Sequence, residues 1–220
     1  MKVSFVIPSY NSFHLVNQLL VDLHEHCQPD EVIVVDDCSA EQNALDGLAW
    51  WRNNFNVTVL RTPENLGFLK ASNYGMKQAA GDVIVLISTD VRVYKNLGAI
   101  AKSITQIKGK ILLGGKYYTE TTGWNEFGTR IFPYVEGWLL IAKKEHWKEL
   151  GYFDERYAPN DFEDVDLSTT AIQKGFSLAQ ITPDNGVVVE HIGAQTIGYT
   201  DERRELTERN RKKFEEKWLS

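Results

Sequence analysis

VSFVIPSYN, residues 3–11, begins the chain with an apolar run that stops at small polar side chains. A continuous rather than alternating apolar run is typical of a strand that is buried on both faces, as in a parallel sheet. Similar runs recur at 31–35, 57–60 and 82–87. Apolar residues at helical spacing fill the intervals at 13–26, 40–51 and 68–79. This order predicts an α/β fold: a Rossmann-like, mostly parallel central sheet flanked by helices, with a ligand crevice at the carboxyl ends of the strands.

The alternation changes after Ile87. We expect a helix at 91–107, an extended piece at 111–115, a loop with Gly and aromatic residues at 117–134 and a strand at 135–142. Helices at 145–150, 161–174 and 201–218 and short strands at 178–181 and 187–190 complete the prediction. Because no repeat or Pro/Ser-rich linker interrupts the chain, residues 1–220 are predicted to form a single domain.

Composition excludes several classes of protein. The net charge of −6 and the lack of long Lys/Arg runs argue against a nucleic-acid partner. The first apolar run is too short for a signal peptide, and no later run could form an integral membrane segment, so we expect a cytoplasmic protein. Cys27 and Cys38 form no CxxC pair and are expected to be free thiols. The oligomeric state is left open.

Polar side chains follow all four predicted parallel strands. They are Ser9, Tyr10 and Asn11, then Asp36 and Asp37, then Asn65 and Gly67, and finally Thr89 and Asp90. A buried carboxylate without a partner costs about several kcal/mol, so a ligand-binding edge explains this pattern better than core packing. No G-x-G-x-x-G follows a strand, and Gly115 stands where the near-match to a P-loop would need a lysine.

Acidic residues are dense around Phe162-Glu163-Asp164-Val165-Asp166-Leu167. One explanation is a capping box, with Asn160 or Asp161 as the N-cap and Glu163 or Asp164 at the third helical position. A cap accounts for one or two acids and not for four. An apolar stripe at 162, 165, 169 and 172 would leave Asp161, Asp164 and Ser168 on a face that looks into the crevice. We therefore predict a chemical role for this segment.

Six segments together resemble the family 2 glycosyltransferases, which have the GT-A fold of nucleotide-diphospho-sugar transferases. They are 6–11 (VIPSYN), 32–39 (VIVVDDCS), 65–68 (NLGF) with 71–75 (ASNYG), 88–90 (STD), 151–155 (GYFDE) and 163–166 (EDVD). The resemblance implies transfer of a hexose or deoxyhexose from a nucleotide sugar, with UDP favoured, to an acceptor hydroxyl with inversion, as in polysaccharide biosynthesis. It divides the domain into a nucleotide-sugar half (1–90), an acceptor and catalytic half (91–200) and a C-terminal helix (201–220).

The resemblance places the nucleotide at the strand ends. Asp37 matches the aspartate that accepts the ring N–H of the base, although it could instead cap the helix after Ser39. Tyr10 would wall the base, or could be a core aromatic. The residues expected around the nucleotide are Pro8, Ser9, Tyr10, Asn11, Asp36, Asp37, Asn65, Gly67, Asn73 and Thr89.

A divalent cation, Mn²⁺ or Mg²⁺, is implied between the donor phosphates, with Asp90 as the last acid of a DxD-like motif. Ser88 occupies the position of the first acid, so a single carboxylate would hold the metal. His191 matches a histidine that adds a metal contact in many relatives, although isolated histidines are more often structural.

Asp164 is the candidate general base and Glu163 the reserve candidate, because inverting transfer needs a carboxylate beside the acceptor hydroxyl. For the carbohydrate-type acceptor we expect Gly137, Trp138 and Trp124, since indole faces pack against sugar C–H groups. Trp138 could also be a core residue, and Trp124 is expected on a loop that could act as a lid.

Two other classes remain possible from the sequence. A sugar nucleotidyltransferase would need a Gly- and Lys/Arg-rich loop after the first strand, and Pro8-Ser9-Tyr10-Asn11-Ser12 is not one. A non-catalytic module that binds nucleotide sugars or carbohydrates is favoured by Ser88. Such a module would bind donor without turnover.

Overall fold

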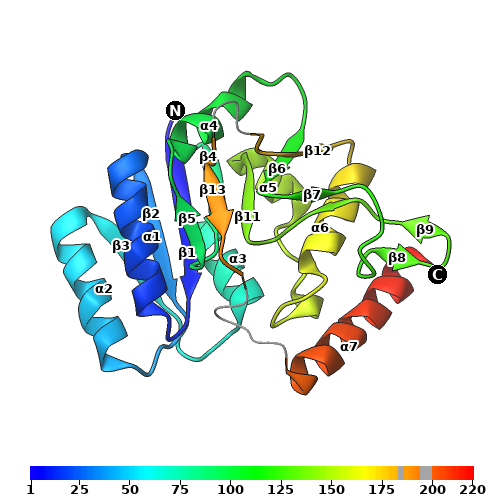
Figure 1. Ribbon diagram of the computed structural model, residues 1–220, viewed down its shortest axis with the longest axis horizontal. Helices are drawn as coiled ribbons and strands as arrows, with labels where there is room; N and C mark the ends of the chain where they lie inside the picture. The colour runs from blue at the N-terminus through cyan, green and yellow to red at the C-terminus, as the bar shows by residue number, and fades with distance from the viewer. Residues whose placement is uncertain (183–185, 194–199) are drawn as a thin grey trace.

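A seven-stranded sheet forms the centre of the computed structural model, which describes residues 1–182, 186–193 and 200–220. The strand order is β12-β6-β11-β4-β1-β2-β3 (Figure 1). Strands β4, β1, β2 and β3 are parallel, and β11 is antiparallel to its neighbours β4 and β6. The expected α/β fold with a mostly parallel central sheet is therefore confirmed.

The first half of the chain alternates strands and helices as expected. Its elements are β1 (Val3–Ser9), α1 (Phe13–His26), β2 (Glu31–Asp36), α2 (Gln42–Phe55), β3 (Val57–Arg61), α3 (Phe68–Gln78) and β4 (Val83–Ile87). The second half contains β5 (Val91–Val93), α4 (Leu97–Ser103), β6 (Ile111–Gly114), β7 (Tyr117–Tyr118), β8 (Glu126–Phe127), β9 (Arg130–Ile131), β10 (Tyr134–Val135), β11 (Leu139–Lys143), α5 (Lys144–Leu150), α6 (Glu163–Gln173), β12 (Ser177–Gln180), β13 (Val189–His191) and α7 (Asp201–Trp218). Short 3₁₀ turns cover 104–106 and 155–157.

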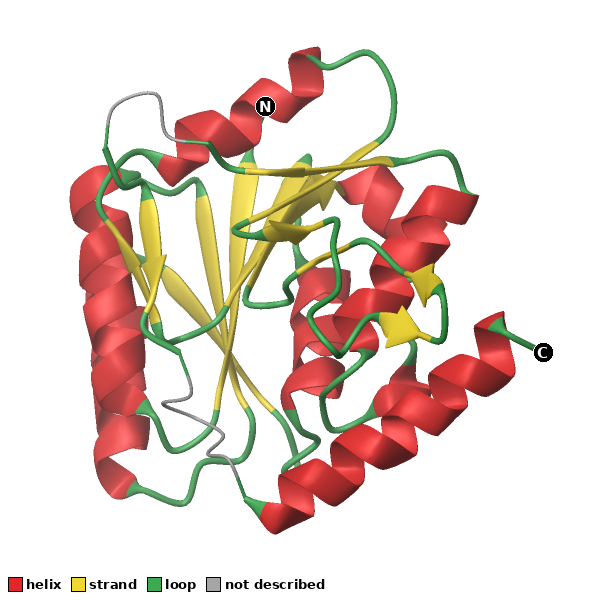
Figure 2. Ribbon diagram, turned by 45° about the vertical axis from the view of Figure 1, so that its right-hand side comes forward, coloured by secondary structure: helices red, strands yellow, loops and turns green. Residues whose placement is uncertain are grey.

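Helices cover both faces of the sheet because successive strand residues point to opposite sides (Figures 1 and 2). Phe5 and Ile7 of β1 belong to the core shared with α1, α2 and α4. Val6 between them belongs to the core shared with α3, α5, α6 and α7. All three side chains are fully buried. A strand buried on both faces needs the continuous apolar run that begins this chain.

Gly67 sets the start of α3 and with it the shape of the loop after β3. Its φ of +81° is in the region that favours glycine, and a Cβ there would lie 2.4 Å from Cβ of Pro159. The backbone N–H of Leu69 donates to the carbonyl of Pro159 at 3.0 Å. The loop after β3 is thereby tied to the segment that precedes α6.

Two predictions for the second half were wrong. Residues 91–93 form β5, not the start of a helix, and pair with β13. Val91 and Val93 are buried, while Arg92 between them pairs with Asp22 of α1. The side chains thus alternate every two residues, as in a strand, rather than follow helical spacing. The predicted loop at 117–134 contains β7, which pairs antiparallel with β10, and β8 and β9, which pair antiparallel with each other.

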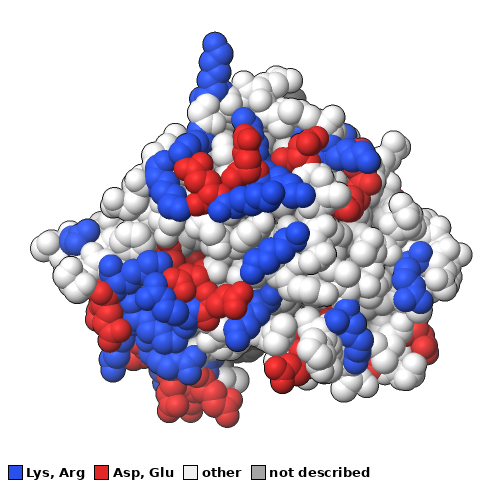
Figure 3. Space-filling model, turned by 180° about the vertical axis from the view of Figure 1, so that it is seen from behind, with Lys and Arg blue, Asp and Glu red and all other residues white. Residues whose placement is uncertain are grey.

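Helix α7 lies on the α6 side of the molecule, at the lower right of Figure 1. Phe214 in its C-terminal half is fully buried among Phe127, Phe132 and Phe162. Lys, Arg, Asp and Glu side chains are mixed where α7 reaches the surface, at the lower left of Figure 3. Helix α7 is therefore docked onto the domain through its apolar side. Within the described ranges, no helix combines the length and the apolar character needed to cross a bilayer.

Candidate active site

A pocket of about 240 Å³ opens beside the carboxyl ends of β1 and β4. Residues from both halves of the chain line it: Pro8, Phe68, Ser88, Thr89, Asp90, Glu136, Gly137, Trp138, Asn160, Asp161, Glu163, Asp164, His191 and Arg203. Eight of the predicted site residues are among them: Pro8, Thr89, Asp90, Gly137, Trp138, Glu163, Asp164 and His191. The structure therefore brings the predicted metal, base and acceptor residues into one pocket.

Asp90 and His191 meet through the pairing of β5 with β13. His191 lies opposite Val91 in this ladder, which brings its Nε2 to 3.4 Å from Oδ1 of Asp90. The backbone N–H of Ile192 donates to the carbonyl of Asp90 at 3.0 Å. The neighbouring Glu190 faces away and accepts a hydrogen bond from the Tyr94 hydroxyl at 2.7 Å, as alternation along a strand predicts.

These two side chains fit a divalent cation that completes its coordination with ligand oxygens. Two neighbouring ligands of an octahedral Mg²⁺ or Mn²⁺ at about 2.1 Å are about 3 Å apart, close to the separation of Asp90 and His191. Within the described ranges, no group of three or more His, Cys, Asp or Glu side chains could hold a metal by itself. A cation here would thus depend on phosphate oxygens and water for its other ligands.

Asp164 is held at the start of α6 with its carboxylate toward the turn before β11. Its Oδ2 accepts from the backbone N–H of Gly137 at 3.1 Å, and its Oδ1 accepts from Val165 N–H at 2.8 Å. Burial raises the pKa of Asp164 to about 7, assisted by the charges of Glu136 and Asp161 and opposed by these two N–H groups. A carboxylate with this pKa is suited to accept a proton near neutral pH.

Glu163 is the other acid at the start of α6. Its side chain is 7% exposed, and its Oε2 has no hydrogen-bond partner among the described residues. Burial, reinforced by the charges of Asp164 and Asp161, raises the pKa of Glu163 well above its usual value. The two neighbouring acids therefore differ, because Asp164 has two backbone donors that stabilise its charge and Glu163 has none beyond its own N–H.

The capping box, the alternative explanation for the acids of this segment, does not form. The residue before the helix is Phe162, with φ +72°, and no side chain caps it. The predicted apolar stripe is wrong at one position, because Ile172 is 42% exposed. Ser168, expected to look into the crevice, instead accepts from the N–H of Val135 at 3.2 Å.

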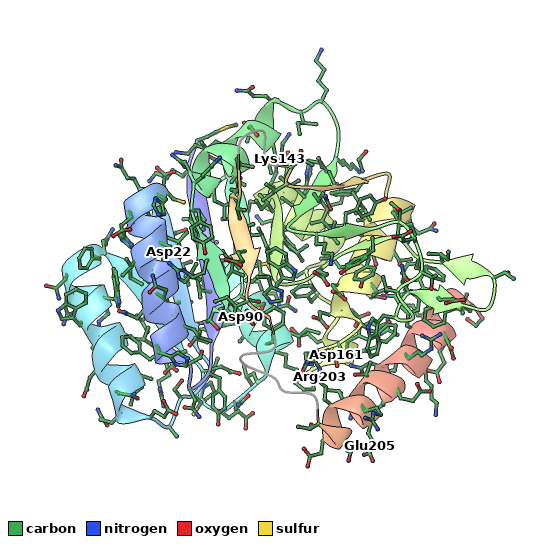
Figure 4. All side chains as sticks on the ribbon, viewed as in Figure 1. Asp22, Asp90, Lys143, Asp161, Arg203 and Glu205 are labelled. Carbon is green, nitrogen blue, oxygen red and sulfur yellow. The ribbon has the colours of Figure 1, made fainter. Side chains whose placement is uncertain are left out.

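The other acids of this segment anchor α7. Asp161 accepts from Arg203 at 3.0 Å and from the Thr207 hydroxyl at 2.6 Å, and Figure 4 shows Asp161 and Arg203 side by side between α6 and α7. Asp166 is 2% exposed and accepts from Lys217 and from Nε1 of Trp218, both at 2.8 Å. The four acids thus have different roles: Glu163 and Asp164 lie at the pocket, Asp166 anchors α7, and Asp161 lines the pocket and also binds α7.

Arg203 is a pocket residue that the sequence analysis missed. Five carboxylates line the pocket, and Arg203 is the one Lys or Arg side chain among the described lining residues. One pattern in the sequence could have indicated that this face of α7 contacts the domain. It is a mainly polar stripe at helical spacing, formed by Arg203, Thr207, Asn210, Phe214 and Lys217. Asn210 donates to the carbonyls of Tyr157, Asn160 and Asp161 at 2.7–2.9 Å.

Asp37 lies at the strand edge but outside the lining of the pocket. It is 3% exposed and accepts from the Thr62 hydroxyl at 2.9 Å and from the N–H groups of Leu66 and Gly67 at 2.9 and 2.8 Å. Oδ1 receives two of these bonds and Oδ2 one, so Oδ2 keeps an acceptor position. The carboxylate orders the 62–67 loop and does not cap a helix.

The remaining predicted nucleotide residues support the loops around the strand ends. Asp36 pairs with Arg61 and accepts from Ser39 N–H at 3.1 Å. Asn11 accepts from the N–H of Ala40 at 2.9 Å, Asn65 accepts from Gly67 N–H at 3.0 Å, and the hydroxyls of Ser9 and Ser12 are 3.2 Å apart. Tyr10 is 40% exposed and is not a core aromatic.

Two predicted contacts are placed elsewhere by the structure. Asn73 is 2% exposed, and its amide donates to the Phe153 carbonyl at 2.9 Å and accepts from Phe153 N–H at 3.0 Å, so it clamps α3 to the 151–155 turn. Trp124 is 53% exposed and is not among the described lining residues. The segment before it is instead held to α7, since Arg211 donates to the carbonyl of Gly123 at 3.1 Å.

The chain is similar in sequence and in structure to known glycosyltransferases. The chain is 35% identical over 99 residues to poly(ribitol-phosphate) beta-N-acetylglucosaminyltransferase TarS of Staphylococcus aureus, a match that covers 43% of this chain and 17% of TarS. The structure of S. aureus TarS 1-349 in complex with UDP-GlcNAc matches with a TM-score of 0.61 and 24% identity, over 94% of this chain and 64% of that one. The mannosyltransferase PcManGT of Pyrobaculum calidifontis, solved with GDP-Man and Mn²⁺, matches with a TM-score of 0.66 and 22% identity. The match covers 89% of this chain and 58% of PcManGT.

The two structural matches establish the fold, which is that of GT-A transferases. The chain matches less than a third of the length of TarS. The sequence profile of glycosyl transferase family 2 matches residues 4–167, from the first residues of β1 into α6. Since this range is well over half of the chain and contains Asp37, Asp90, Glu163 and Asp164, the protein belongs to glycosyl transferase family 2.

Proposed function

We propose that the chain transfers a sugar from a nucleoside diphosphate sugar, with a UDP-sugar favoured, to a hydroxyl of a carbohydrate-type acceptor, with inversion at the anomeric carbon. The observation that carries this proposal is the Asp164 carboxylate, fixed by Gly137 N–H in the same pocket as the Asp90–His191 pair. A base and a phosphate-side cation site in one pocket are the two groups that this transfer requires.

Asp164 would act as the general base. The acceptor hydroxyl donates its hydrogen bond to the carboxylate and transfers the proton as its oxygen forms a bond to the anomeric carbon. The bond from that carbon to the diphosphate breaks on the opposite face, so the configuration inverts. Two backbone N–H donors hold the carboxylate in place, and its pKa of about 7 leaves it largely ionised above neutral pH.

Asp90 and His191 would hold Mn²⁺ or Mg²⁺, which when bound offsets the charge gathering on the departing diphosphate. The acidic lining supports this assignment. A diphosphate approaching Asp90, Glu136, Asp161, Glu163 and Asp164 is repelled, and Arg203 already pairs with Asp161. PcManGT was solved with Mn²⁺, which supports the same ion here.

The nucleotide would lie against Pro8 and the exposed ring of Tyr10, with the acceptor position on Oδ2 of Asp37 for the ring N–H of the base. The TarS complex with UDP-GlcNAc supports a UDP-sugar. The acceptor would enter over Gly137 and Trp138. TarS is named for transfer to poly(ribitol-phosphate), which supports an acceptor that presents hydroxyls.

The test is nucleotide release in the presence of Mn²⁺ from a panel of UDP-glucose, UDP-galactose, UDP-GlcNAc and GDP-mannose. We expect release from a UDP-sugar, and a product whose anomeric configuration, read by NMR, is opposite to that of the donor. Binding of donor without release under any acceptor condition would instead support the non-catalytic module. A retained configuration would overturn the role of Asp164 as base.

A further inference from the structure

Two side chains of the pocket have polar atoms that no group of the described residues satisfies. Nδ2 of Asn160 and Oε2 of Glu163 are closed to solvent and have no hydrogen-bond partner among the described residues. Both side chains are 7% exposed and both line the pocket. Buried polar groups are nearly always hydrogen-bonded, so two orphans in one pocket indicate a missing ligand.

Glu163 is expected to carry a proton, given its surroundings. The charged or titratable groups around the same pocket are Asp161 and Asp164 on its own segment, Glu136 before β11, Arg203 on α7, and Asp90 and His191 across β5 and β13. Acids outnumber bases in this set. Burial and the nearby acids raise the pKa of Glu163, and its own N–H and Arg203 offset this only in part. A neutral acid is a hydrogen-bond donor.

The two unpartnered atoms show where hydrogen-bond acceptors are missing. Nδ2 of Asn160 is a donor, and Oε2 of a protonated Glu163 is a second donor. Both groups line the pocket, and their terminal torsions are soft enough to turn these atoms toward a ligand. The other carboxyl oxygen, Oε1, lies 3.4 Å from the point where a Cβ on Gly137 would be, and the same point is 3.8 Å from Oδ2 of Asp164. The pair of donors therefore lies beside the base.

We propose that Asn160 and Glu163 form a subsite for the hydroxyl next to the attacking hydroxyl of a polyol acceptor. This inference rests on the proposed function, since it places the attacking hydroxyl on Asp164. The neighbouring hydroxyl oxygen would accept hydrogen bonds from Glu163 Oε2–H and Asn160 Nδ2–H, the two donors that lack partners among the described residues. Gly137 leaves the space for this pair of hydroxyls, because any side chain there would contact both acids.

The charges around the subsite favour an uncharged group at this position of the acceptor. A carboxylate or phosphate placed between Glu163 and Asp164 would lie against the negative charge of Asp164, Glu136 and Asp161. Like charges at contact distance cost free energy that Arg203, already paired with Asp161, does not offset. A hydroxyl gains the same two hydrogen bonds without this repulsion. The subsite thus selects vicinal hydroxyls over acidic groups.

The experiment compares glycerol with propane-1,3-diol, which lacks only the middle hydroxyl, as acceptors in the nucleotide-release assay at pH 8. The readout is the ratio of release with each alcohol to release with water alone. We expect glycerol to give a ratio about 10-fold or more above that of propane-1,3-diol in the wild type. Asn160→Ala and Glu163→Ala should reduce this preference about 3- to 10-fold, while Glu163→Gln, which keeps a donor, should retain most of it. The exposed Glu208→Gln on α7 is the control and should match the wild type.

Infrared spectroscopy provides a readout that does not depend on turnover. As the pH is raised, the wild type should keep the carbonyl stretch of a protonated carboxyl group that is absent in Glu163→Gln and present in Glu208→Gln. The inference is overturned if this band is missing, if Glu163→Gln is as impaired as Glu163→Ala, or if the wild type does not discriminate between the two alcohols. No nucleotide release from any donor would instead overturn the proposed function, and the infrared band would still report on Glu163.

Discussion

The indole of Trp138 stacks on the imidazole of His191, with ring centroids 4.8 Å apart and planes 14° from parallel. Nε1 of Trp138 donates to Glu136 at 2.6 Å, and Glu136 accepts from the Tyr118 hydroxyl at 3.1 Å. A Cβ on Gly115 would lie 1.9 Å from the indole, so only glycine leaves room for the ring. The stack fixes the plane of His191 and directs its Nε2 toward Asp90.

Replacement of Trp138 by Leu should weaken Mn²⁺ binding, because His191 loses the surface that holds its ring. Groups that orient metal ligands typically contribute about 10–100-fold to metal affinity. We expect an increase of about 10-fold in the Kd for Mn²⁺, measured by electron paramagnetic resonance in the presence of UDP. Trp50→Leu, at a 52% exposed position on α2, is the control and should bind Mn²⁺ like the wild type. Equal Kd values for Trp138→Leu and wild type would show that the stack does not position His191.

Asp90→Asn tests the metal site at its carboxylate. This substitution keeps the shape of the side chain and removes the charge that a hard cation prefers. We expect Mn²⁺-dependent binding of UDP to disappear in calorimetry, while binding of uridine, which has no phosphate, is retained. Loss of both ligands together would indicate that Asp90 has a structural role in the β5–β13 region.

The sequence allowed the sheet and the location of the pocket to be predicted, because both follow from local patterns. Apolar runs and helical spacing are local, and parallel strands necessarily bring their carboxyl ends to one edge. The roles of Asp161 and Asp166 could not be predicted in this way, since their partners Arg203 and Lys217 are 42 and 51 residues away. Asn73 was misplaced for the same reason, because its partner is the backbone of Phe153.

Asp37 is expected to contribute to stability as well as to donor binding. Asp37→Ala would leave the N–H group of Leu66 without its acceptor, whereas the Thr62 hydroxyl keeps the Glu64 carbonyl and Gly67 N–H keeps Asn65. A buried donor left unsatisfied costs about 1–3 kcal/mol, so we expect the free energy of unfolding to fall by about that amount. Urea denaturation measures this change. The exposed Glu64→Ala in the same loop is the control, and an unchanged midpoint for Asp37→Ala would contradict the observed network.

Asp166 should stabilise the docking of α7. Its carboxylate is buried and accepts from Lys217, Trp218 and the Tyr157 hydroxyl, the last at 3.1 Å. Removal of one member of a buried ion pair costs about 3 kcal/mol. Asp166→Ala should therefore lower the free energy of unfolding by about that amount and increase hydrogen exchange in α7, whereas Glu208→Ala on the exposed side should not. If hydrogen exchange in Asp166→Ala increased only in elements other than α7, Asp166 would not be what holds α7 in place.

Asp164→Asn tests the general base. Asparagine keeps the shape of the side chain and can still accept the bond from Gly137 N–H, but it cannot take a proton as a carboxylate does. Turnover should fall by about 10²–10⁴-fold, with affinity for UDP near that of the wild type. Glu163→Gln should have a milder effect. Full turnover of Asp164→Asn, or a dead Glu163→Gln variant, would mean that the base is misplaced.

The pH dependence provides a second test of the same residue. Because the base acts when ionised and burial raises the pKa of Asp164 to about 7, kcat/KM of the wild type should rise with pH up to about 7 and then level off. The residual activity of Asp164→Asn should lack this rise. Stability should change in the opposite sense: a raised carboxyl pKa favours the folded state below the unfolded value near 4, and this contribution is lost as the pH rises through 7. The Tm of wild type relative to Asp164→Asn should therefore decrease between pH 4 and 8, and a constant difference would indicate that Asp164 does not titrate in this range.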